Sequence, residues 1–361
     1  MGLGVKVAVR PSLKKIYLLS PILIACAGSA LAQSRSAILP GPKPPDAPSE
    51  WKVWIGEYGL KEATFTVGES EGHVFIIDKA GGKKSELPGP PIEKAVTTEW
   101  SDTTGVLVRF DRGPLGEQVL LTNDLRWPRK TYGIDEQQVA RVKPVRAIDE
   151  LRAQALAATP TKETGNFRRP DLVELALLDP DIHLDIRYAT SNDFLGTPVY
   201  SEARAFLQRP AAEALLRVQQ KLRPLGYGLL IHDAYRPWFV TKIFWDATPS
   251  EGKIFVADPA QGSRHNRGCA VDLTLYEVAT GKPVEMPGSY DEMSPRSYPD
   301  YPGGTSLERW HRDLLRRAME SEGFTVYVAE WWHFVYKDWK EYPILNVPFE
   351  KLVPNAAGAT H

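Results

Sequence analysis

Between residues 51 and 145, short apolar runs alternate with Gly, Pro, Asp and Asn. The runs are KVWIGEY, ATFTV, HVFIID, KAVTT, GVLVRF and EQVLLT, with turns at KAGGKK and FDRGPLGE. This pattern is typical of short strands joined by turns. We therefore expect a small antiparallel β-domain of about six to eight strands over residues 51–146. Its single histidine, His73, has no partners at metal-ligand spacing, so we expect a binding or spacer module.

From about residue 166 the hydrophobic spacing alternates between helix and strand. Pro210 suits the first turn of a helix, and apolar residues then recur at spacings of four, three and four up to Leu222, before Pro224. Thr305 and Glu308 have capping-box spacing at the start of a second amphipathic helix, which Gly323 ends. Strands are predicted around 182–188, in YGLLIHD and in FTVYVAEWWHFVY. The predicted fold class is α+β.

The N-terminus carries a targeting signal. A basic stretch from Lys6 to Lys15 precedes the apolar run IYLLSPILIACAGSALA, and ALA stands just before Gln33. We interpret residues 1–32 as a secretory signal peptide, so the protein is expected in the periplasm or cell envelope. LIAC, which ends at Cys26, also resembles a lipoprotein box. Membrane attachment is expected only if Cys26 is lipidated.

The remaining boundaries follow from composition. Residues 33–50 are a Pro-rich linker, 147–165 a helix and linker, 166–352 the catalytic domain and 353–361 a tail. The formal net charge of −1 argues against a nucleic-acid partner. Cys26 and Cys269 are the only cysteines, so removal of the signal leaves no intramolecular disulfide.

The segment SRHNRGCAVDLTL, residues 263–275, contains an aspartate in an apolar strand. Asp272 can be a salt-bridged or capping residue, or it can bind a metal. A catalytic zinc takes three N or O ligands and leaves a position for water. His265, Asp272 and His333 supply such a set, and a bound cation offsets the lost hydration of a buried carboxylate.

Two further residues complete this constellation. Glu330, three residues before His333, suits a general base that is not itself a ligand. Positions i and i+3 of a regular strand face opposite sides, so a bulge, twist or turn is required there. Arg236, after a buried strand, is either a surface residue or a fixed cation for an oxyanion. We interpret Cys269 as a packing residue, and the remaining histidines of this half as structural.

At these residues the chain resembles the D-alanyl-D-alanine dipeptidases, which are zinc peptidases. SRHNRGCAVDLTLY matches the family's Ser-x-His-x-x-Gly-x-Ala-x-Asp motif, and EWWHF matches its Glu-x-x-His motif. The resemblance spans about residues 172–350. It includes LDIRYAT, GYGLLIHDAYRP and TGKPVEMPGSYDEMSPRS. The β-domain lies outside it, and Ser297-Tyr298 stands where relatives often carry Ser-His.

The resemblance implies a catalytic domain with a central antiparallel sheet flanked by helices. It also implies one zinc ion on His265, Asp272 and His333, with Glu330 as general base and Arg236 as the stabiliser of the intermediate. The positions matching the family's dipeptide contacts are Ser263, Tyr188 and Asp291. A carboxylate at Asp291 suits the free ammonium group that a dipeptidase must recognise.

The expected function is therefore zinc-dependent hydrolysis of D-alanyl-D-alanine, or a similar small D,D-dipeptide, in the cell envelope. One alternative is a D,D-carboxypeptidase or endopeptidase acting on peptidoglycan stem peptides. Another is a binding protein with a degenerate catalytic domain. A cell-wall or other ligand is a further possible partner of the β-domain.

Overall fold

The computed structural model describes residues 37–87, 92–94, 97–101, 107–114, 116–122, 125–132 and 141–353, together with Met1. The rest of the predicted signal peptide, with Cys26, lies outside the described residues, as does the tail beyond Val353. The chain divides into two units, Met1–Ala37 and Ile38–His361. None of the helices in the described part is long and apolar enough to cross a membrane.

The first part of the second unit is built from short antiparallel strands. They form a four-stranded sheet in the order β1-β2-β3-β4 and a five-stranded sheet in the order β5-β6-β7-β8-β9. The strands are β1 (Gly56–Tyr58), β2 (Phe65–Ser70), β3 (His73–Asp78), β4 (Lys83–Leu87), β5 (Ile92–Lys94), β6 (Thr97–Ser101), β7 (Leu107–Arg112), β8 (Gln118–Thr122) and β9 (Leu125–Pro128). The described residues between 51 and 132 thus hold nine strands, one more than the upper end of the range expected for residues 51–146.

The first predicted strand of this region begins later than expected. Ser49–Lys52 forms a short helix, α2, because the Pro48 carbonyl accepts hydrogen bonds from the backbone N–H groups of Trp51 and Lys52. Trp51 is buried there in an apolar cluster with residues of both sheets, among them Val67 and Phe110. This cluster is separate from the larger core of the C-terminal part.

A five-stranded sheet forms the centre of the C-terminal part. Its order is β11-β13-β14-β16-β15, and all neighbours are antiparallel except β11 and β13. Its strands are β11 (His183–Leu184), β13 (Tyr227–Asp233), β14 (Ala270–Glu277), β15 (Phe324–Tyr327) and β16 (Glu330–Tyr336). Strands β10 (Leu172–Glu174) and β12 (Phe206–Gln208) pair as a separate ribbon. The fold class is α+β.

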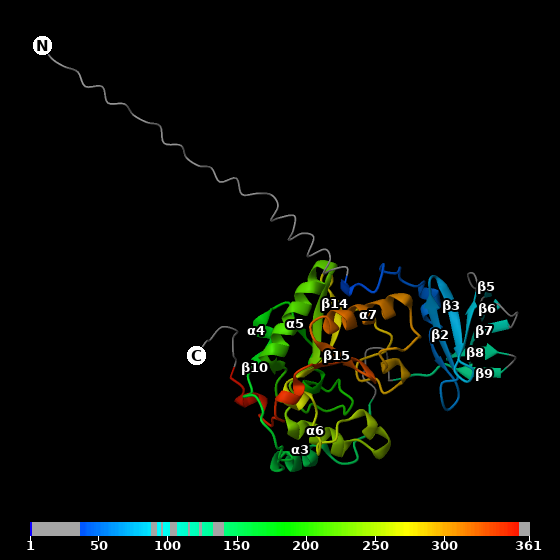
Figure 1. Cartoon of the computed structure of the whole chain (residues 1–361). Helices are drawn as coiled ribbons and strands as arrows, with labels where there is room; N and C mark the ends of the chain where they lie inside the picture. The colour runs from blue at the N-terminus through cyan, green and yellow to red at the C-terminus, as the bar shows by residue number, and fades with distance from the viewer. Residues whose placement is uncertain are drawn as a thin grey trace. The chain divides into compact units, whose positions relative to one another are not determined.

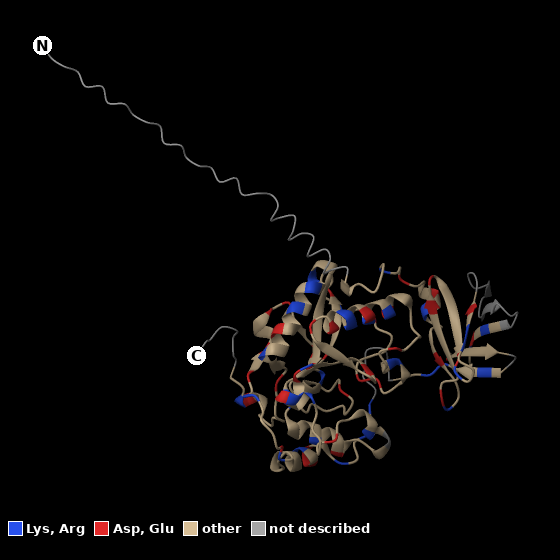
Figure 2. Ribbon diagram, viewed as in Figure 1, with Lys and Arg blue, Asp and Glu red and all other residues tan. Residues whose placement is uncertain are grey.

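Helices cover this sheet and the loops around it. They are α3 (Ile148–Ala157), α4 (Leu175–Leu178), α5 (Arg209–Leu222), α6 (Trp238–Ala247) and α7 (Ser306–Glu320). Helices α5 and α7 contact each other and the central sheet, whereas α3 packs against α6 (Figure 1). Acidic and basic residues are interspersed over the described chain (Figure 2), in keeping with its small net charge.

The helix signals in the sequence are confirmed. Pro210 lies in the first turn of α5, and Pro224 lies in a 3-10 turn that follows it. Thr305 and Glu308 form the capping box of α7, with both reciprocal hydrogen bonds present. Gly323 follows α7 with a φ of 87°, which an L side chain rarely adopts. Helix α6 was not predicted, because its apolar residues are not confined to one face.

Two predicted strands differ in the structure. The strand expected at 182–188 shrinks to the two residues of β11, and a 3-10 turn, Arg187–Ala189, follows it. The single strand expected at 324–336 is a hairpin of β15 and β16, which Val328 and Ala329 connect. Apolar and aromatic runs alone do not mark such reversals, because the hairpin turn lacks Gly, Pro, Asn and Asp.

The described part of the Pro-rich segment packs against the C-terminal part. Ile38 is buried in its core, and the Trp310 indole N–H donates to the Gly41 carbonyl at 3.1 Å. This stretch is therefore held to the C-terminal part at Ile38 and Gly41.

Candidate metal centre and active site

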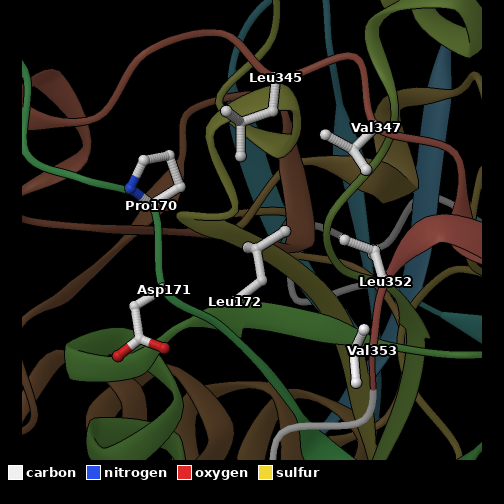
Figure 3. Close-up of a pocket in the computed structure, with 7 residues that line it drawn as sticks. All are labelled: Pro170, Asp171, Leu172, Leu345, Val347, Leu352 and Val353. Carbon is white, nitrogen blue, oxygen red and sulfur yellow. The ribbon is translucent and has the colours of Figure 1, made fainter. Parts of the chain in front are cut away.

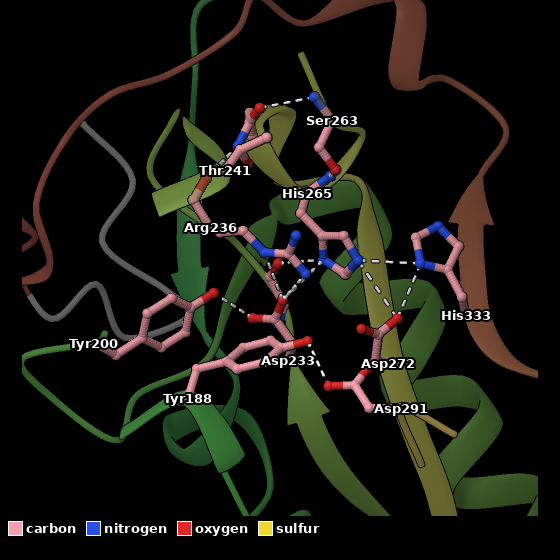
Figure 4. A network of polar contacts seen from close by, with 12 residues as sticks. Tyr188, Tyr200, Asp233, Arg236, Thr241, Ser263, His265, Asp272, Asp291 and His333 are labelled. Carbon is pink, nitrogen blue, oxygen red and sulfur yellow. Dashed lines mark hydrogen bonds and ion pairs between the residues drawn. The ribbon is translucent and has the colours of Figure 1, made fainter. Parts of the chain in front are cut away.

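Three metal-ligating side chains meet at one end of the central sheet (Figure 4). His265 lies in a 3-10 turn (His265–Arg267) just before β14, Asp272 lies on β14 and His333 lies opposite it on β16. His333 Nδ1 is 3.0 Å from Asp272 Oδ1 and 3.1 Å from His265 Nε2. His265 Nε2 is 3.4 Å from Asp272 Oδ1. The structure thus brings together the three ligands that the sequence suggests.

The turn before β14 depends on Gly268. Its φ is 67°, and a Cβ there would lie 2.5 Å from Leu172 Cδ2. The chain can therefore reverse after His265 and enter β14 with Asp272 directed at the same point.

A backbone carbonyl orients the imidazole ring of His265. His265 Nδ1 lies 2.7 Å from the Ala234 carbonyl oxygen, which can only accept a hydrogen bond. When the imidazole is neutral, this contact favours the tautomer with the proton on Nδ1, which leaves the Nε2 lone pair free for a metal ion.

The donor set fits a divalent metal of the zinc type. Ligand atoms about 2.0–2.2 Å from a tetrahedral ion lie roughly 3.3–3.6 Å from one another, a few tenths of an ångström more than the shorter separations given above. Asp272 Oδ1 is buried and accepts no hydrogen bond from the described residues. A buried carboxylate oxygen without a donor is expected where a cation binds.

The surroundings of Asp272 also favour its charged form. Burial by itself would raise the pKa of this carboxyl, but positive charge on the adjacent His265 and His333 outweighs burial and lowers the pKa below its usual range. The other oxygen, Oδ2, lies 3.3 Å from the Tyr290 hydroxyl, which donates to it.

Glu330 reaches the cluster through an irregularity in the hairpin. The pairing of β15 and β16 shifts between Val326 and Tyr327, so that Tyr327 pairs with Glu330. Glu330 Oε2 consequently lies 3.6 Å from His333 Nδ1, although the two residues are three apart. Burial raises the pKa of the Glu330 carboxyl to about 7, and His333 acts in the opposite direction.

Arg236 is held in the site and is not a surface residue. Its Nε and Nη2 donate to Asp233 Oδ2 at 3.0 and 2.7 Å, and its guanidinium lies over the rings of Tyr188 and Phe244. Asp233 is fully buried, and the Tyr200 hydroxyl donates to its Oδ1 at 2.6 Å. These contacts fix the direction of the Arg236 side chain (Figure 4).

Sequence reasoning missed Asp233 and Asn266. Asp233 ends the apolar strand β13, a signal of the same kind as the one that marked Asp272. Asn266, also fully buried, accepts from the Ser263 backbone N–H at 2.7 Å and donates to the Arg236 carbonyl at 2.8 Å. It therefore joins the His265 turn to the segment that carries Arg236.

The three residues matched to substrate contacts line the same cavity as the metal cluster. This cavity is bordered by Ser263, Tyr188 and Asp291 together with Arg236 and Glu330. The Tyr188 hydroxyl donates to Asp291 Oδ2 at 2.8 Å. Asp291 has a φ of 57°, unusual for a residue other than glycine. Burial, followed by the nearby Asp272, raises the pKa of the Asp291 carboxyl to about 7.

A second cavity has no comparable chemistry. It is lined by Pro170, Asp171, Leu172, Leu345, Val347, Leu352 and Val353 (Figure 3). Asp171 is its one titratable side chain, and it already pairs with Arg209 at 2.6 Å. No metal-cluster residue lines this cavity, so we assign it no part in the reaction.

The remaining polar candidates have structural surroundings. Cys269 is fully buried, and burial raises the pKa of its thiol to about 12, so it is a poor nucleophile. The rings of His183 and His232 stack on Tyr276 and Tyr290, and His311 contacts the hydroxyl of Tyr227.

Two imidazoles and a carboxylate, with a second carboxylate and an arginine beside them in a cavity, define a metal-dependent hydrolase. The peptidase M15 family model, described as D-Ala-D-Ala dipeptidase, matches residues 168–351. The chain belongs to this family of metallopeptidases.

Several relatives match about half of this chain. The D-alanyl-D-alanine dipeptidase of Escherichia coli (strain K12) is 35% identical over 179 residues, which are 50% of this chain and 91% of the relative. The enzyme of that name from Enterococcus faecium is 35% identical over 192 residues, 47% of this chain and 95% of the relative. That of Streptomyces coelicolor is 35% identical over 175 residues, 44% and 87% of the two chains.

Proposed function

We propose that this protein hydrolyses D-alanyl-D-alanine, or a similar small D,D-dipeptide, to free amino acids with the help of one zinc ion. The observation that carries the proposal is the buried His265, Asp272 and His333 cluster, which shares one cavity with Glu330 and Asp291. The relatives described above bear the name of this activity. A set of two imidazole nitrogens and one carboxylate oxygen favours zinc.

A zinc ion held by these three residues would polarise the scissile carbonyl and lower the pKa of a bound water. The protein supplies the proton transfers and the charge stabilisation. Glu330 takes the proton of the attacking water and then delivers it to the leaving amine. Arg236, already oriented by Asp233, stabilises the negative charge that develops on the carbonyl oxygen.

The polar groups of the cavity suit the free amino end of a dipeptide. Asp291 is a buried carboxylate that an ammonium group can pair with, and the Tyr188 hydroxyl holds it in place. The hydroxyl of Ser263 accepts from the His265 backbone N–H at 3.2 Å, and its own proton is available to substrate. A peptide whose amine is blocked offers Asp291 no positive charge to pair with, so a dipeptidase should reject it.

Substrate length tests this proposal. The purified protein with added zinc should hydrolyse D-alanyl-D-alanine and leave the N-acetylated dipeptide and a stem pentapeptide intact. Free D-alanine measured over time is the readout. Turnover of the blocked or long peptides would instead assign a carboxypeptidase or endopeptidase with the same metal site.

A Glu330→Gln variant tests the proposed base. The amide cannot take a proton, so kcat should fall by about 10²–10⁴-fold, while zinc content measured by elemental analysis stays unchanged. Glu350→Gln, at an exposed glutamate outside the cavity, is the matched control and should retain full activity. A protein that only binds its ligand would show the same ligand affinity in both variants.

We also propose that the protein acts outside the cytoplasm, on the strength of residues 1–32. Mass spectrometry of the protein from a bacterial host should give Gln33 as its first residue. A lipid on Cys26 would instead assign a membrane-anchored lipoprotein, and an intact Met1 would exclude processing at either position.

A further inference from the structure

The segment between β14 and α7 carries Asp291 and is buried despite having little regular structure. Within residues 285–305 the structure has one 3-10 turn, Pro295–Ser297. Yet several of its side chains are almost inaccessible, namely Tyr290, Glu292, Ser294, Ser297 and Tyr301. Such a loop needs contacts from outside to hold one conformation, because it has few backbone hydrogen bonds of its own.

Part of this support is internal to the loop. Glu292, next to Asp291, accepts hydrogen bonds from the Ser289 backbone N–H at 2.9 Å and from Arg296 Nε and Nη2 at 2.7 and 2.6 Å. The hydroxyl of Ser294 also donates to Glu292. This cluster stabilises the chain at the point where Asp291 adopts its positive φ.

The sheet β1–β4 provides a first external contact. The Tyr301 hydroxyl donates to Glu57 Oε1 on β1 at 2.6 Å, and Thr66 Oγ1 on β2 donates to the same oxygen at 2.8 Å. Glu57 is 1% exposed, and Lys79 forms an ion pair with it. A hydrogen bond to a buried, charged acceptor is among the stronger ones in a protein.

A second external contact lies where the loop enters α7. The backbone N–H of Glu69, on β2, donates to the Gly304 carbonyl at 3.0 Å, and Glu69 Oε2 accepts from the Ser306 N–H at 2.8 Å. Arg309 Nη2 on α7 donates to the Glu69 carbonyl at 2.6 Å. The sheet therefore touches the C-terminal part of the loop at Tyr301 and at Gly304–Ser306.

We propose that the sheet β1–β4 positions the Asp291 loop for substrate, with Glu57 and Tyr301 as the positioning residues. This inference rests on the proposed function, since it assigns Asp291 to the substrate ammonium group. Glu57, Thr66 and Glu69 precede residues 168–351, so the family model does not include them. The sheet thus acts on the substrate through the Asp291 loop and contributes no residue to the lining of the cavity.

Removal of single hydroxyl groups tests this proposal. Tyr301→Phe deletes the hydrogen bond to Glu57 and leaves the ring in place. We expect the KM for D-alanyl-D-alanine to rise by about three- to tenfold, with kcat and zinc content nearly unchanged, because binding is lost equally in ground and transition states. Glu57→Gln should raise KM in the same way, and the double variant should add little to either single one.

Tyr58→Phe is the matched control. The Tyr58 hydroxyl is also buried in this region, but it donates to the Trp54 carbonyl at 2.7 Å and does not reach the loop. This variant should lower the melting temperature by a similar amount and leave KM unchanged. Equal changes of KM in the two tyrosine variants, or no change in either, would overturn the proposal.

A second measurement is independent of activity. Amide hydrogen exchange of peptides spanning 285–305 should be faster in Tyr301→Phe than in the unaltered protein, and unchanged in Tyr58→Phe. If the protein has no dipeptidase activity, the proposed function fails while this exchange result still decides whether the sheet orders the loop. Unchanged exchange in Tyr301→Phe would overturn the positioning role.

Discussion

Asp233 and Asp272 are both buried acids on neighbouring strands, and their partners separate their roles. Asp272 faces two imidazole nitrogens and has an oxygen without a hydrogen-bond donor among the described residues, as a metal ligand does. Asp233 is instead saturated by Arg236, Tyr200 and the Ala234 backbone N–H. A buried carboxylate therefore indicates its chemistry through the groups around it, not through burial alone.

Replacement of Asp233 should reduce catalysis without removing the metal ligands. Asp233→Asn leaves the shape but takes away the charge that orients Arg236, so kcat should fall by about 10–100-fold. Tyr200→Phe removes only one hydrogen bond to Asp233 and should have a smaller effect. Steady-state kinetics with zinc analysis measure both. A kcat unchanged in Asp233→Asn would contradict the positioning of Arg236 by this residue.

Asp193 makes stability depend on pH. Burial raises its pKa to about 6, although backbone N–H donors, including that of Leu195, lower it. In the unfolded chain an aspartate titrates near pH 3.9, so between about pH 4 and 6 the folded state binds more protons. The free energy of unfolding therefore falls as pH rises through this window, by about 2 kcal/mol from this group.

The variant Asp193→Asn should lose this dependence, because the amide does not titrate. The difference between its free energy of unfolding and that of the unaltered protein should shift in favour of the variant by a similar amount from pH 4 to pH 7. Urea unfolding at each pH would measure this difference. Parallel stability profiles for the two proteins would show that Asp193 titrates normally.

At the scale of elements, irregularities in the central sheet build the site. The pairing of β13 with β14 shifts at His232, and that of β15 with β16 shifts beside Tyr327. Bulges of this kind redirect side chains at the ends of strands. They bring Asp233 opposite Asp272, and Glu330 to the same side as His333.

The turn at Gly268 offers a test of this construction. Gly268→Ala places a Cβ against Leu172 in a left-handed backbone, so we expect a loss of about 1–3 kcal/mol of stability and weaker zinc binding. Gly226→Ala is the control, since its φ is 87° but no atom lies within 4 Å of the added Cβ. Gly226→Ala should lose stability through backbone strain but keep its zinc affinity. Competition with a chelator would measure that affinity. Equal zinc affinity in both variants would contradict the role of Gly268 in placing His265.

At the scale of the whole molecule, metal binding and folding should be linked. The cluster joins β14, β16 and the turn before β14, so a bound ion ties together segments from residues 265 to 333. Zinc at about 100 times its dissociation constant stabilises the folded state by roughly 2.7 kcal/mol.

Removal of the metal by a chelator should therefore lower the melting temperature by about 5–10 °C, and added zinc should restore it. His311→Asn, outside the cluster, should keep this response, whereas His333→Ala should lose it. A melting temperature insensitive to zinc in the unaltered protein would argue against the proposed centre.

Much of this molecule could be predicted from local pattern. The capping box of α7, the proline in the first turn of α5 and the apolar strand β13 follow from short-range steric and hydrogen-bonding rules. The α+β class and the three members of the His265, Asp272 and His333 cluster could also be predicted, because the two motifs combine His and Asp donors with strand-like apolar runs.

The hairpin within 324–336 and the helix α6 could not be predicted in this way. Their apolar residues are compatible with several elements, and packing against the rest of the chain selects one of them. The same holds for Asn266 and Tyr301, whose partners lie far away in the sequence.

The sequence by itself determined which donors are present and where α5 and α7 begin and end, because these depend on residue type and on neighbours a few positions away. Only the tertiary structure decided how His265 and His333, 68 residues apart, come within 3.1 Å of each other. It alone also joined Glu57 to Tyr301 across 244 residues. Such contacts depend on strand register, bulges and the packing of loops, which are long-range properties that no short segment contains.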